Sequence, residues 1–226
     1  MSYNGQRCTA LKLIFVHKSV SAEFRSKFTK AVDALVLDHP ATDSTLTPLP
    51  ERNKVEHMEA YVDDAVSKGA QVINKNAGRV SDTAFFPAVL YPVTDEMDIF
   101  HEEQFGPVVP IVEYEDLEEV MSSIAASDCG QQCSLFSDNE LTIAYAVDNM
   151  VNQVCRVNIN ASCQRGPDYL PFTGRKDSAV ATLSVHDALR SFSIRTLVAT
   201  GTDQKQLFGN VISGGQSNWM TTDYLL

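Results

Sequence analysis

Short apolar runs alternate with longer amphipathic segments along most of this chain. Residues 11–16 are almost continuously apolar and end near a polar break, which is typical of a buried strand. Residues 21–36 instead carry an apolar side chain at every third or fourth position from Phe24 to Leu35, which is the spacing of one helix face. The pattern therefore predicts a strand followed by a helix.

The same alternation continues as far as residue 159. Further helices are predicted over 51–68, 115–126 and 139–150, and further strands over 71–74, 84–91, 108–112, 133–136 and 154–159. Residues 39–50 and 76–81 are polar and predict a loop and a turn. Strands that alternate with helices of this length favour βα units, so we expect an α/β fold with an open, mostly parallel, doubly wound sheet.

Composition narrows the class of protein. Of the 226 residues, 44% are hydrophobic and 21% are charged, as in an ordinary soluble globular protein. The net charge of -11 disfavours a nucleic-acid-binding surface, and no apolar run is long enough for a membrane span. The count of five cysteines is odd, which favours a reducing compartment over a disulfide framework, so we expect a cytoplasmic protein.

Cys8 lies in a polar turn near the start of the chain, Asn4-Gly5-Gln6-Arg7-Cys8-Thr9. A thiol reacts as its thiolate, and a neighbouring cation such as Arg7 favours that form. Two interpretations stand. Cys8 is either a nucleophile that adds to a carbonyl carbon or a buried structural cysteine, which is the more frequent case for a lone cysteine.

Two runs downstream of Cys8 bear on this choice. The first is Glu102-Glu103-Gln104-Phe105-Gly106-Pro107-Val108, which alone is compatible with an acidic loop and an F-G-P turn. The second begins at Val157-Asn158-Ile159-Asn160 and continues through Gln164-Arg165-Gly166-Pro167-Asp168-Tyr169-Leu170-Pro171-Phe172-Thr173-Gly174-Arg175-Lys176-Asp177-Ser178.

In this order, the three segments resemble the aldehyde dehydrogenase superfamily, which has G-Q-x-C-T, E-E-x-F-G-P-V and P-F-x-G-x-K-x-S motifs. The resemblance implies that Cys8 attacks the aldehyde and that Thr9 lies in the substrate site. It implies that Glu103 bonds the nicotinamide ribose, that Phe105 packs near the nicotinamide, and that Phe172 walls the aldehyde tunnel. A carboxylate accepts ribose hydroxyls well, and an apolar wall helps to exclude water during hydride transfer.

Two of these motifs have a narrower form. G-Q-R-C-T and R-G-P-D-x-x-P-F look like the non-phosphorylating glyceraldehyde-3-phosphate dehydrogenases, where the arginines matching Arg7 and Arg165 help to hold the substrate phosphate. Guanidinium groups suit phosphate oxygens, although both arginines could instead form only loop salt bridges. The resemblance implies oxidation of glyceraldehyde 3-phosphate to 3-phosphoglycerate, with NADP or NAD as the cofactor.

Parts of the family pattern are missing. The family's general-base glutamate, in an E-L-G-G-K-like motif, and its oxyanion-hole asparagine lie well upstream of the nucleophile, whereas seven residues precede Cys8. We therefore expect the catalytic portion of a longer enzyme, inactive on its own. The family usually has glycines after the position of Ser178, where this chain has Ala179-Val180-Ala181-Thr182, so the backbone path there need not follow the family's.

We expect one catalytic domain over residues 1–200 and a C-terminal extension over 201–226, a stretch rich in Gly, Ser, Asn and Gln. Residues 191–200 look like the family's late strand, which takes part in joining subunits. An unpaired edge strand has to be covered, so a homo-oligomer is expected. The other expected partner is a small aldehyde, phosphorylated if the arginines act as the resemblance implies; no nucleic-acid or membrane partner is expected.

Three alternatives remain. The chain could be a naturally short, non-catalytic partner subunit of a full-length dehydrogenase, a dehydrogenase of other specificity, or a thiol hydrolase, for which the sequence places no base. The five histidines are scattered without metal-ligand spacing, so no metal site is expected. His101 is expected to hydrogen-bond to its neighbour Glu102.

Overall fold

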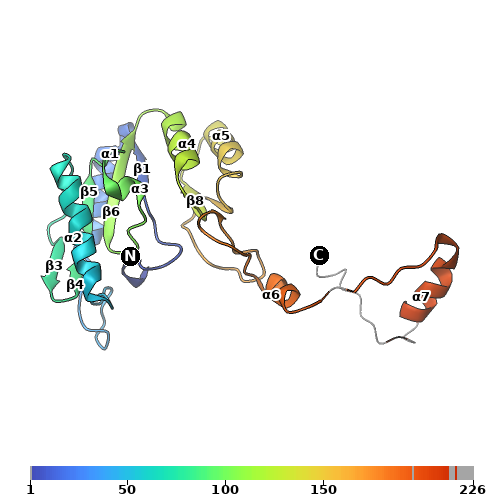
Figure 1. Cartoon of the computed structure of the whole chain (residues 1–226). Coiled ribbons are helices and arrows are strands. Elements are labelled where there is room, and N and C mark those ends of the chain that lie inside the picture. Colours follow the sequence, from blue (N-terminus) through green and yellow to red (C-terminus); the bar gives the residue numbers. More distant parts are fainter. Residues whose placement is uncertain (1, 195, 214–216, 218–226) are drawn as a thin grey trace. The chain divides into compact units, whose positions relative to one another are not determined.

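The computed structural model describes residues 2–194, 196–213 and 217, which divide into two units. The first unit consists of Met1–Arg165 and Thr173–Ala181, and the second of Gly166–Phe172 and Thr182–Leu226. Figure 1 shows their elements along the chain. The sequence predicts a catalytic domain over residues 1–200 and an extension over 201–226. That division stays a prediction.

A four-stranded sheet with the strand order β1-β6-β5-β2 forms the centre of the first unit. Its strands are β1 (Ile14–His17), β6 (Val108–Tyr114), β5 (Ala88–Tyr91) and β2 (Gln71–Val72). β1, β6 and β5 are parallel, with Ile14 opposite Ile111 and Ala88 opposite Val108, whereas β2 pairs antiparallel at one edge. Because β1 and β5 both pair with β6, β6 is an interior strand of the sheet.

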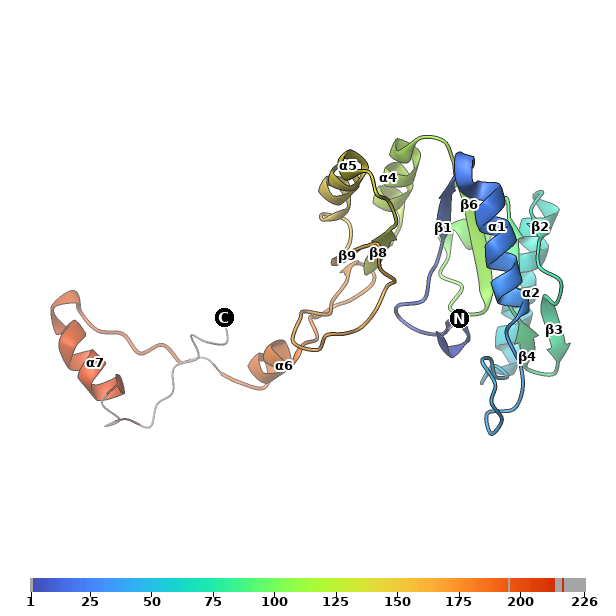
Figure 2. The ribbon, with the colours of Figure 1, turned by 180° about the vertical axis from the view of Figure 1, so that it is seen from behind.

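Helices cover both faces of this sheet. They are α1 (Lys18–Asp33), α2 (Arg52–Ser67) and the short α3 (Asp98–His101). Successive strand residues point to opposite faces: Leu90 and Val108 pack in one core with α2, while Val89 and Ile111 pack in another with α1. Figures 1 and 2 show α2 and α1 on opposite sides of the sheet. The predicted open, mostly parallel, doubly wound α/β sheet is confirmed.

A third core completes the first unit. Its elements are α4 (Leu117–Ala126), α5 (Glu140–Met150) and the parallel strands β8 (Gln132–Leu135) and β9 (Arg156–Ile159). Val120, Met150 and Cys133 pack together between these helices and strands. Two short strands, β7 (Cys129–Gly130) and β10 (Arg175–Lys176), pair antiparallel and tie residues 173–181 to the first unit.

The region around Pro87 differs from the sequence prediction. The single strand predicted over 84–91 is divided into β4 (Ala84–Phe86) and β5, because Pro87 has no N–H to donate to a ladder. The turn predicted over 76–81 is also wrong, because β3 (Gly78–Ser81) pairs antiparallel with β4. Most of β3 is exposed, so it lacks the apolar alternation that indicates a half-buried strand.

Other differences concern element ends. α1 begins at Lys18 rather than at residue 21, because the Nδ1 of His17 caps it by accepting the N–H of Ser19 at 3.3 Å. α2 ends as predicted before Gly69, whose φ of 104° suits a residue without a side chain. The remaining predicted helices and strands are present with ends shifted by a few residues, and the short elements α3, β7 and β10 were not predicted.

The second unit contains α6 (Val185–Ser191), the 3₁₀ turn η2 (Thr202–Gln204) and α7 (Lys205–Ser213). Residues 192–194 and 196–200, the described part of the predicted late strand after α6, form no strand pairing within this chain, so pairing with another subunit stays a prediction. Residues 195, 214–216 and 218–226 lie outside the described residues. None of the described helices has the length and apolarity needed to cross a bilayer.

The side chain of Asn74 makes hydrogen bonds to the backbone at Pro87 and Val89 that a neighbouring strand would otherwise make. Its side chain is buried, its Nδ2 donates to the Pro87 carbonyl at 2.8 Å, and its Oδ1 accepts the N–H of Val89 at 2.9 Å. We expect Asn74→Ala to lower the free energy of unfolding by about 2 to 4 kcal/mol, because two buried backbone groups lose their partners. Urea denaturation measures this change. The exposed Asn76→Ala is the control, and an equal loss in both variants would contradict the assignment.

Candidate active site

Cys8 is exposed in a turn that precedes β1. The N–H of Gln6 donates to the Tyr3 carbonyl at 2.9 Å, and the N–H of Ala10 donates to the Arg7 carbonyl at 2.8 Å. These two bonds fold the backbone on either side of the thiol. Because the thiol is accessible to solvent, the interpretation of Cys8 as a buried structural cysteine is wrong.

The backbone before Cys8 has an unusual conformation. Tyr3, Asn4 and Gly5 have φ values of 52°, 56° and 77°, in the left-handed region. This region costs a residue with a side chain about 1–2 kcal/mol. Asn4 holds the turn in place: its buried Nδ2 donates to the Thr47 carbonyl at 2.7 Å, and its Oδ1 accepts the Thr47 N–H at 3.2 Å.

Two glycines bring the nucleophile turn against the Glu102–Val108 run. A Cβ on Gly5 would collide with the backbone carbonyl of Gly106, and a Cβ on Gly106 would collide with the sulfur of Met58 in α2. Gly5 therefore needs to be glycine for this close approach of two backbone segments, whereas Gly106 lies against the end of a flexible side chain. The first two sequence motifs, about a hundred residues apart in the chain, are stacked on each other and on α2.

Gln104 joins the same segments from within. The residue is 3% exposed, and its Nε2 lies within hydrogen-bonding distance of the carbonyls of Leu11 (3.1 Å), Lys12 (3.2 Å) and Val108 (3.0 Å). Its own backbone carbonyl accepts a bond from the Nζ of Lys54 at 2.9 Å. The segment after Cys8, the motif loop and the start of β6 are thus fixed to one side chain.

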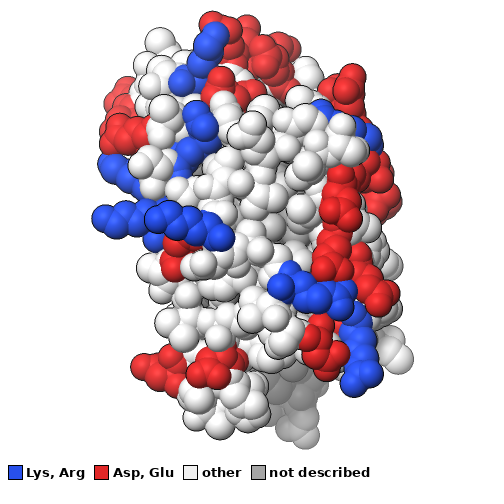
Figure 3. All heavy atoms as spheres, turned by 90° about the vertical axis from the view of Figure 1, so that its left-hand side faces the viewer, with Lys and Arg blue, Asp and Glu red and all other residues white. Residues whose placement is uncertain are grey.

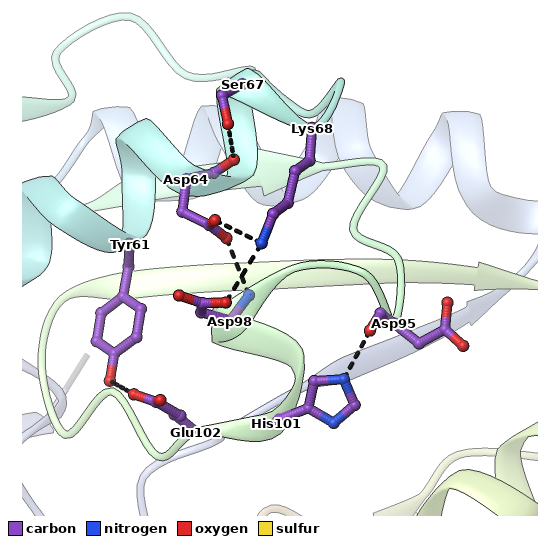
Figure 4. A network of polar contacts seen from close by, with 8 residues as sticks. All are labelled: Tyr61, Asp64, Ser67, Lys68, Asp95, Asp98, His101 and Glu102. Carbon is purple, nitrogen blue, oxygen red and sulfur yellow. Dashed lines mark hydrogen bonds and ion pairs between the residues drawn. The ribbon is translucent and has the colours of Figure 1, made fainter.

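The start of the motif loop is held from α2. The Tyr61 hydroxyl donates to Oε2 of Glu102 at 2.8 Å, as Figure 4 shows. Burial and this hydrogen bond raise the pKa of Tyr61 well above its usual range, so the hydroxyl remains a donor. The bond to Tyr61 engages Glu102 and leaves the neighbouring Glu103 outside this contact.

An ion-pair group anchors α3, which precedes the loop. Lys68 contacts Asp64 at 2.5 Å and Asp98 at 3.3 Å, and the N–H of Asp98 donates to Asp64 at 2.9 Å. His101 Nε2 lies 2.6 Å from the carbonyl oxygen of Asp95, on the far side from Glu102 (Figure 4). The predicted hydrogen bond from His101 to Glu102 is therefore wrong.

Glu103 is exposed, and within the described part of the chain its carboxylate accepts no hydrogen bond. Its charge acts on Lys12, whose Nζ donates to the Phe100 carbonyl at 2.7 Å. Burial lowers the pKa of Lys12, while Cys129 and the carboxylates of Glu103 and Asp128 act in the opposite direction. The Glu103 carboxylate has a half-buried cation nearby and accepts no hydrogen bond from the described residues. It is therefore suited to accept a hydrogen bond from a hydroxyl group of a ligand.

Phe105 also has a left-handed backbone, with a φ of 41°, and its side chain is 38% exposed. The Nζ of Lys54 lies 6.0 Å from the centre of its ring. Of the six non-glycine residues with positive φ among those described, four lie in the three motif segments: Asn4, Phe105, Asn160 and Lys176. Tyr3 directly precedes the first segment, and Asp82 lies in the β3–β4 turn. Strained backbone of this kind concentrates at functional sites.

The third motif supplies anchoring groups. The Nζ of Lys176 donates to the carbonyls of Ile124, Ala125 and Ser127 at 2.7, 3.0 and 2.6 Å, which satisfies the carboxyl end of α4. The Oγ of Ser178 accepts the N–H of Gly130 at 2.8 Å. In this structure the Lys and Ser of the motif hold the chain in place rather than facing the thiol.

The remaining predicted site residues fall in different places. Thr9 and Arg7 flank Cys8 and are half-buried. Arg165, also half-buried, is the last residue of the first stretch of the first unit, and its Nη1 is enclosed. Phe172 belongs to the second unit, where it exchanges two backbone hydrogen bonds of 2.7 Å with Leu183. The structure thus brings Cys8 together with the Glu103 and Phe105 loop.

A cavity of about 300 Å³ lies elsewhere in the first unit, between α2 and the β3–β4 hairpin. Its lining includes the ion pair of Glu59 with Arg79 and none of the predicted site residues. Figure 3 shows the side on which α2, β3 and β4 lie in Figure 1: charges of both signs occupy its margins and uncharged side chains fill the middle. The described residues of this face form no continuous basic area.

Comparison with known proteins gives the family. Residues 1–198 match the sequence model of the aldehyde dehydrogenase family. The chain belongs to the aldehyde dehydrogenase family. It is 32% identical over 200 residues to the NADP-dependent glyceraldehyde-3-phosphate dehydrogenase of Pisum sativum, covering 87% of this chain and 39% of that protein. It is 31% identical over 176 residues to the 3-sulfolactaldehyde dehydrogenase of Priestia aryabhattai, covering 77% and 36%.

A solved aldehyde dehydrogenase agrees with the fold. The NADP-dependent glyceraldehyde-3-phosphate dehydrogenase of Bacillus halodurans C-125, complexed with NADP, superposes with a TM-score of 0.78 and 33% identity. The match covers 83% of this chain and 39% of that one. The chain therefore spans about two fifths of the length of these aldehyde dehydrogenases.

Sequence reasoning missed the residues that assemble this candidate site. Gln104 occupies the free position of the second motif, so no pattern singled it out. Lys54 and Tyr61 appeared only as members of an amphipathic helix. Asn4 did carry a signal, because asparagine before glycine tolerates left-handed turns and bonds to nearby backbone.

The Gly5–Gly106 contact can be tested against a matched glycine. Gly78 also has positive φ, at 99°, but a Cβ there would meet nothing within 4 Å. We expect Gly78→Ala to lower the free energy of unfolding by roughly 1–3 kcal/mol through backbone strain alone and to leave the rate at which iodoacetamide labels Cys8 unchanged. Gly5→Ala must in addition displace the nucleophile turn from Gly106, so it should be more destabilising and change that rate. Peptide mass spectrometry measures the labelling, and equal Cys8 rates in the two variants would contradict the contact.

Proposed function

We propose that this chain is the catalytic portion of an NAD(P)-dependent aldehyde dehydrogenase that oxidises glyceraldehyde 3-phosphate to 3-phosphoglycerate. One observation carries the proposal. The turn that presents the exposed Cys8 packs through Gly5 onto Gly106, in the same loop that exposes Glu103 and Phe105. Nucleophile and proposed cofactor contacts therefore share one platform.

The proposed reaction uses Cys8 for covalent catalysis. Its thiolate adds to the aldehyde carbon, and the resulting hemithioacetal is converted to a thioester as a hydride leaves that carbon. A nicotinamide cofactor, when bound, accepts this hydride. Water then hydrolyses the thioester, which releases the acid and returns the thiol. The base that activates this water is proposed to lie outside the chain.

The residues present fit the nicotinamide riboside part of such a cofactor. The Glu103 carboxylate is exposed and accepts no hydrogen bond from the described residues, so it can accept from ribose hydroxyls. Phe105 offers an exposed aromatic surface two residues along the same loop. NADP is the proposed cofactor, as in the proteins of Pisum sativum and Bacillus halodurans, and NAD is the alternative.

The proposed substrate carries an anionic group, which Arg7 and Arg165 would hold. Arg7 precedes the nucleophile directly, and Thr9 follows it. The related enzymes are named for glyceraldehyde 3-phosphate and 3-sulfolactaldehyde, both aldehydes with an anionic end. Arginine forks suit the oxygens of such groups. Phe172 is proposed to wall the aldehyde path.

A second candidate is a non-catalytic partner subunit of a full-length dehydrogenase. It is favoured by the large apolar side chains after α6: Phe192, Ile194 and Leu197 are almost fully exposed in this chain. Exposed apolar groups in a row are typical of an interaction surface. The same residues could instead join identical subunits, and a homo-oligomer is the assembly proposed first.

The cytoplasm is the proposed compartment, supported by five cysteines that are all free.

Substrate protection of Cys8 tests the proposed function on the chain itself. We expect glyceraldehyde 3-phosphate to slow the labelling of Cys8 by iodoacetamide at concentrations roughly tenfold below those of unphosphorylated glyceraldehyde, the factor expected of one charge-assisted contact. The exposed Cys155 is the internal reference. Repeated turnover to NADPH is not expected, because hydrolysis of the thioester needs the water-activating base that is proposed to lie outside the chain.

Variants identify the groups responsible for this protection. Arg165→Ala should remove most of the advantage of the phosphorylated aldehyde and leave protection by glyceraldehyde unchanged. Arg52→Ala is the matched control, because this exposed arginine has, among the described residues, only the ion pair with Asp82 at 3.8 Å. Equal protection by the two aldehydes in the wild type would overturn the phosphate assignment, and no protection by either would overturn the role of Cys8.

A further inference from the structure

The ring of Tyr3 lies beneath the guanidinium of Arg7. The Cζ of Arg7 is 5.1 Å from the ring centre, which is within the range of a cation–π contact. Tyr3 itself is 71% exposed, so its ring is not part of a core. An exposed aromatic side chain whose ring faces a proposed substrate-binding arginine calls for an explanation other than burial.

The backbone around Tyr3 is arranged for this contact. Tyr3 and Asn4 both adopt left-handed conformations, which side-chain-bearing residues avoid unless the surroundings impose them. The bonds of Asn4 to Thr47 and the stacking of Gly5 on Gly106 impose the conformation here. The result is a reversal of the chain that returns the Tyr3 ring to the arginine four positions later.

Another arginine–tyrosine contact in the first unit shows the contrast. Arg25 lies 3.8 Å from the ring centre of Tyr91, whose hydroxyl donates to Glu113 at 2.6 Å. That tyrosine is at the end of β5, packed against α1, and its contacts are accounted for by the core. The Tyr3–Arg7 contact lies instead on the turn that presents Cys8.

We propose that Tyr3 is a positioning residue that fixes the guanidinium of Arg7 for an anionic substrate; this rests on the proposed function. A cation–π contact engages the face of a guanidinium and needs none of its N–H donors. N–H donors at its edge can then bind the oxygens of a phosphate or sulfonate group beside the thiol. Because the orientation exists before binding, the substrate does not have to order the arginine side chain.

sn-Glycerol 3-phosphate is a suitable probe because it carries the anionic end and no carbonyl for Cys8 to attack. We would measure the concentration that halves the rate of iodoacetamide labelling at Cys8, with glycerol as the uncharged control. Cys155, which also neighbours an arginine, is the internal reference for reagent reactivity. The variants are Arg7→Gln, Tyr3→Leu and Tyr3→Phe.

We expect Arg7→Gln to abolish protection. Tyr3→Leu should raise the half-protecting concentration roughly fivefold, as for about 1 kcal/mol of lost cation–π contact. Tyr3→Phe should keep that concentration within about twofold of the wild type, because the ring remains. Protection retained in Tyr3→Leu but lost in Arg7→Gln would overturn the positioning role and leave the proposed function standing. Protection retained in Arg7→Gln would overturn the anion-binding role of Arg7 and this inference with it. A loss in Tyr3→Phe equal to that in Tyr3→Leu would also overturn the inference, since the hydroxyl and not the ring would then be responsible.

Discussion

The side-chain amide of Gln104 is almost fully removed from solvent and lies within hydrogen-bonding distance of three backbone carbonyls, two just after the nucleophile turn and one in β6. Its Oε1 is buried and accepts from none of the described groups, which costs about 1–3 kcal/mol. The stabilising part of the Gln104 side chain is therefore its Nε2 group, which donates the hydrogen bonds. Because those donors join the chain after Cys8 to the loop of Glu103 and Phe105, the geometry of the candidate site depends on this one group.

The motifs of the family divide between chemistry and support. Cys8, Glu103 and Phe105 are exposed to solvent, where a substrate or cofactor can reach them. Within the described part of the chain, Gly106 contacts Gly5 and α2, and Lys176 binds the carboxyl end of α4, so both support the fold. A match to a motif thus identifies the family, but it does not by itself say which residues of the motif touch a ligand.

The periodic part of the fold could be predicted from the sequence, because α1, α2 and the strands of the sheet bury regular apolar faces. The division at Pro87 and the exposed strand β3 could not be predicted from that pattern, since one depends on a missing N–H and the other buries little. The candidate residues on the nucleophile turn and the motif loop followed from the family resemblance. Their assembly by Gln104, Asn4 and the Gly5–Gly106 contact could not, because it depends on tertiary contacts between residues roughly 40 to 100 positions apart.

Amide hydrogen exchange in Gln104→Leu tests most directly whether one buried side chain fixes the turn of Cys8 to the loop of Glu103 and Phe105. Leucine keeps much of the volume and removes the donors. The account predicts that the amides of Gln6 and Ala10, which close the turns around Cys8, exchange at least about tenfold faster, while that of Val89 in β5 keeps its wild-type rate. Unchanged exchange at Gln6 and Ala10 in this variant would contradict it.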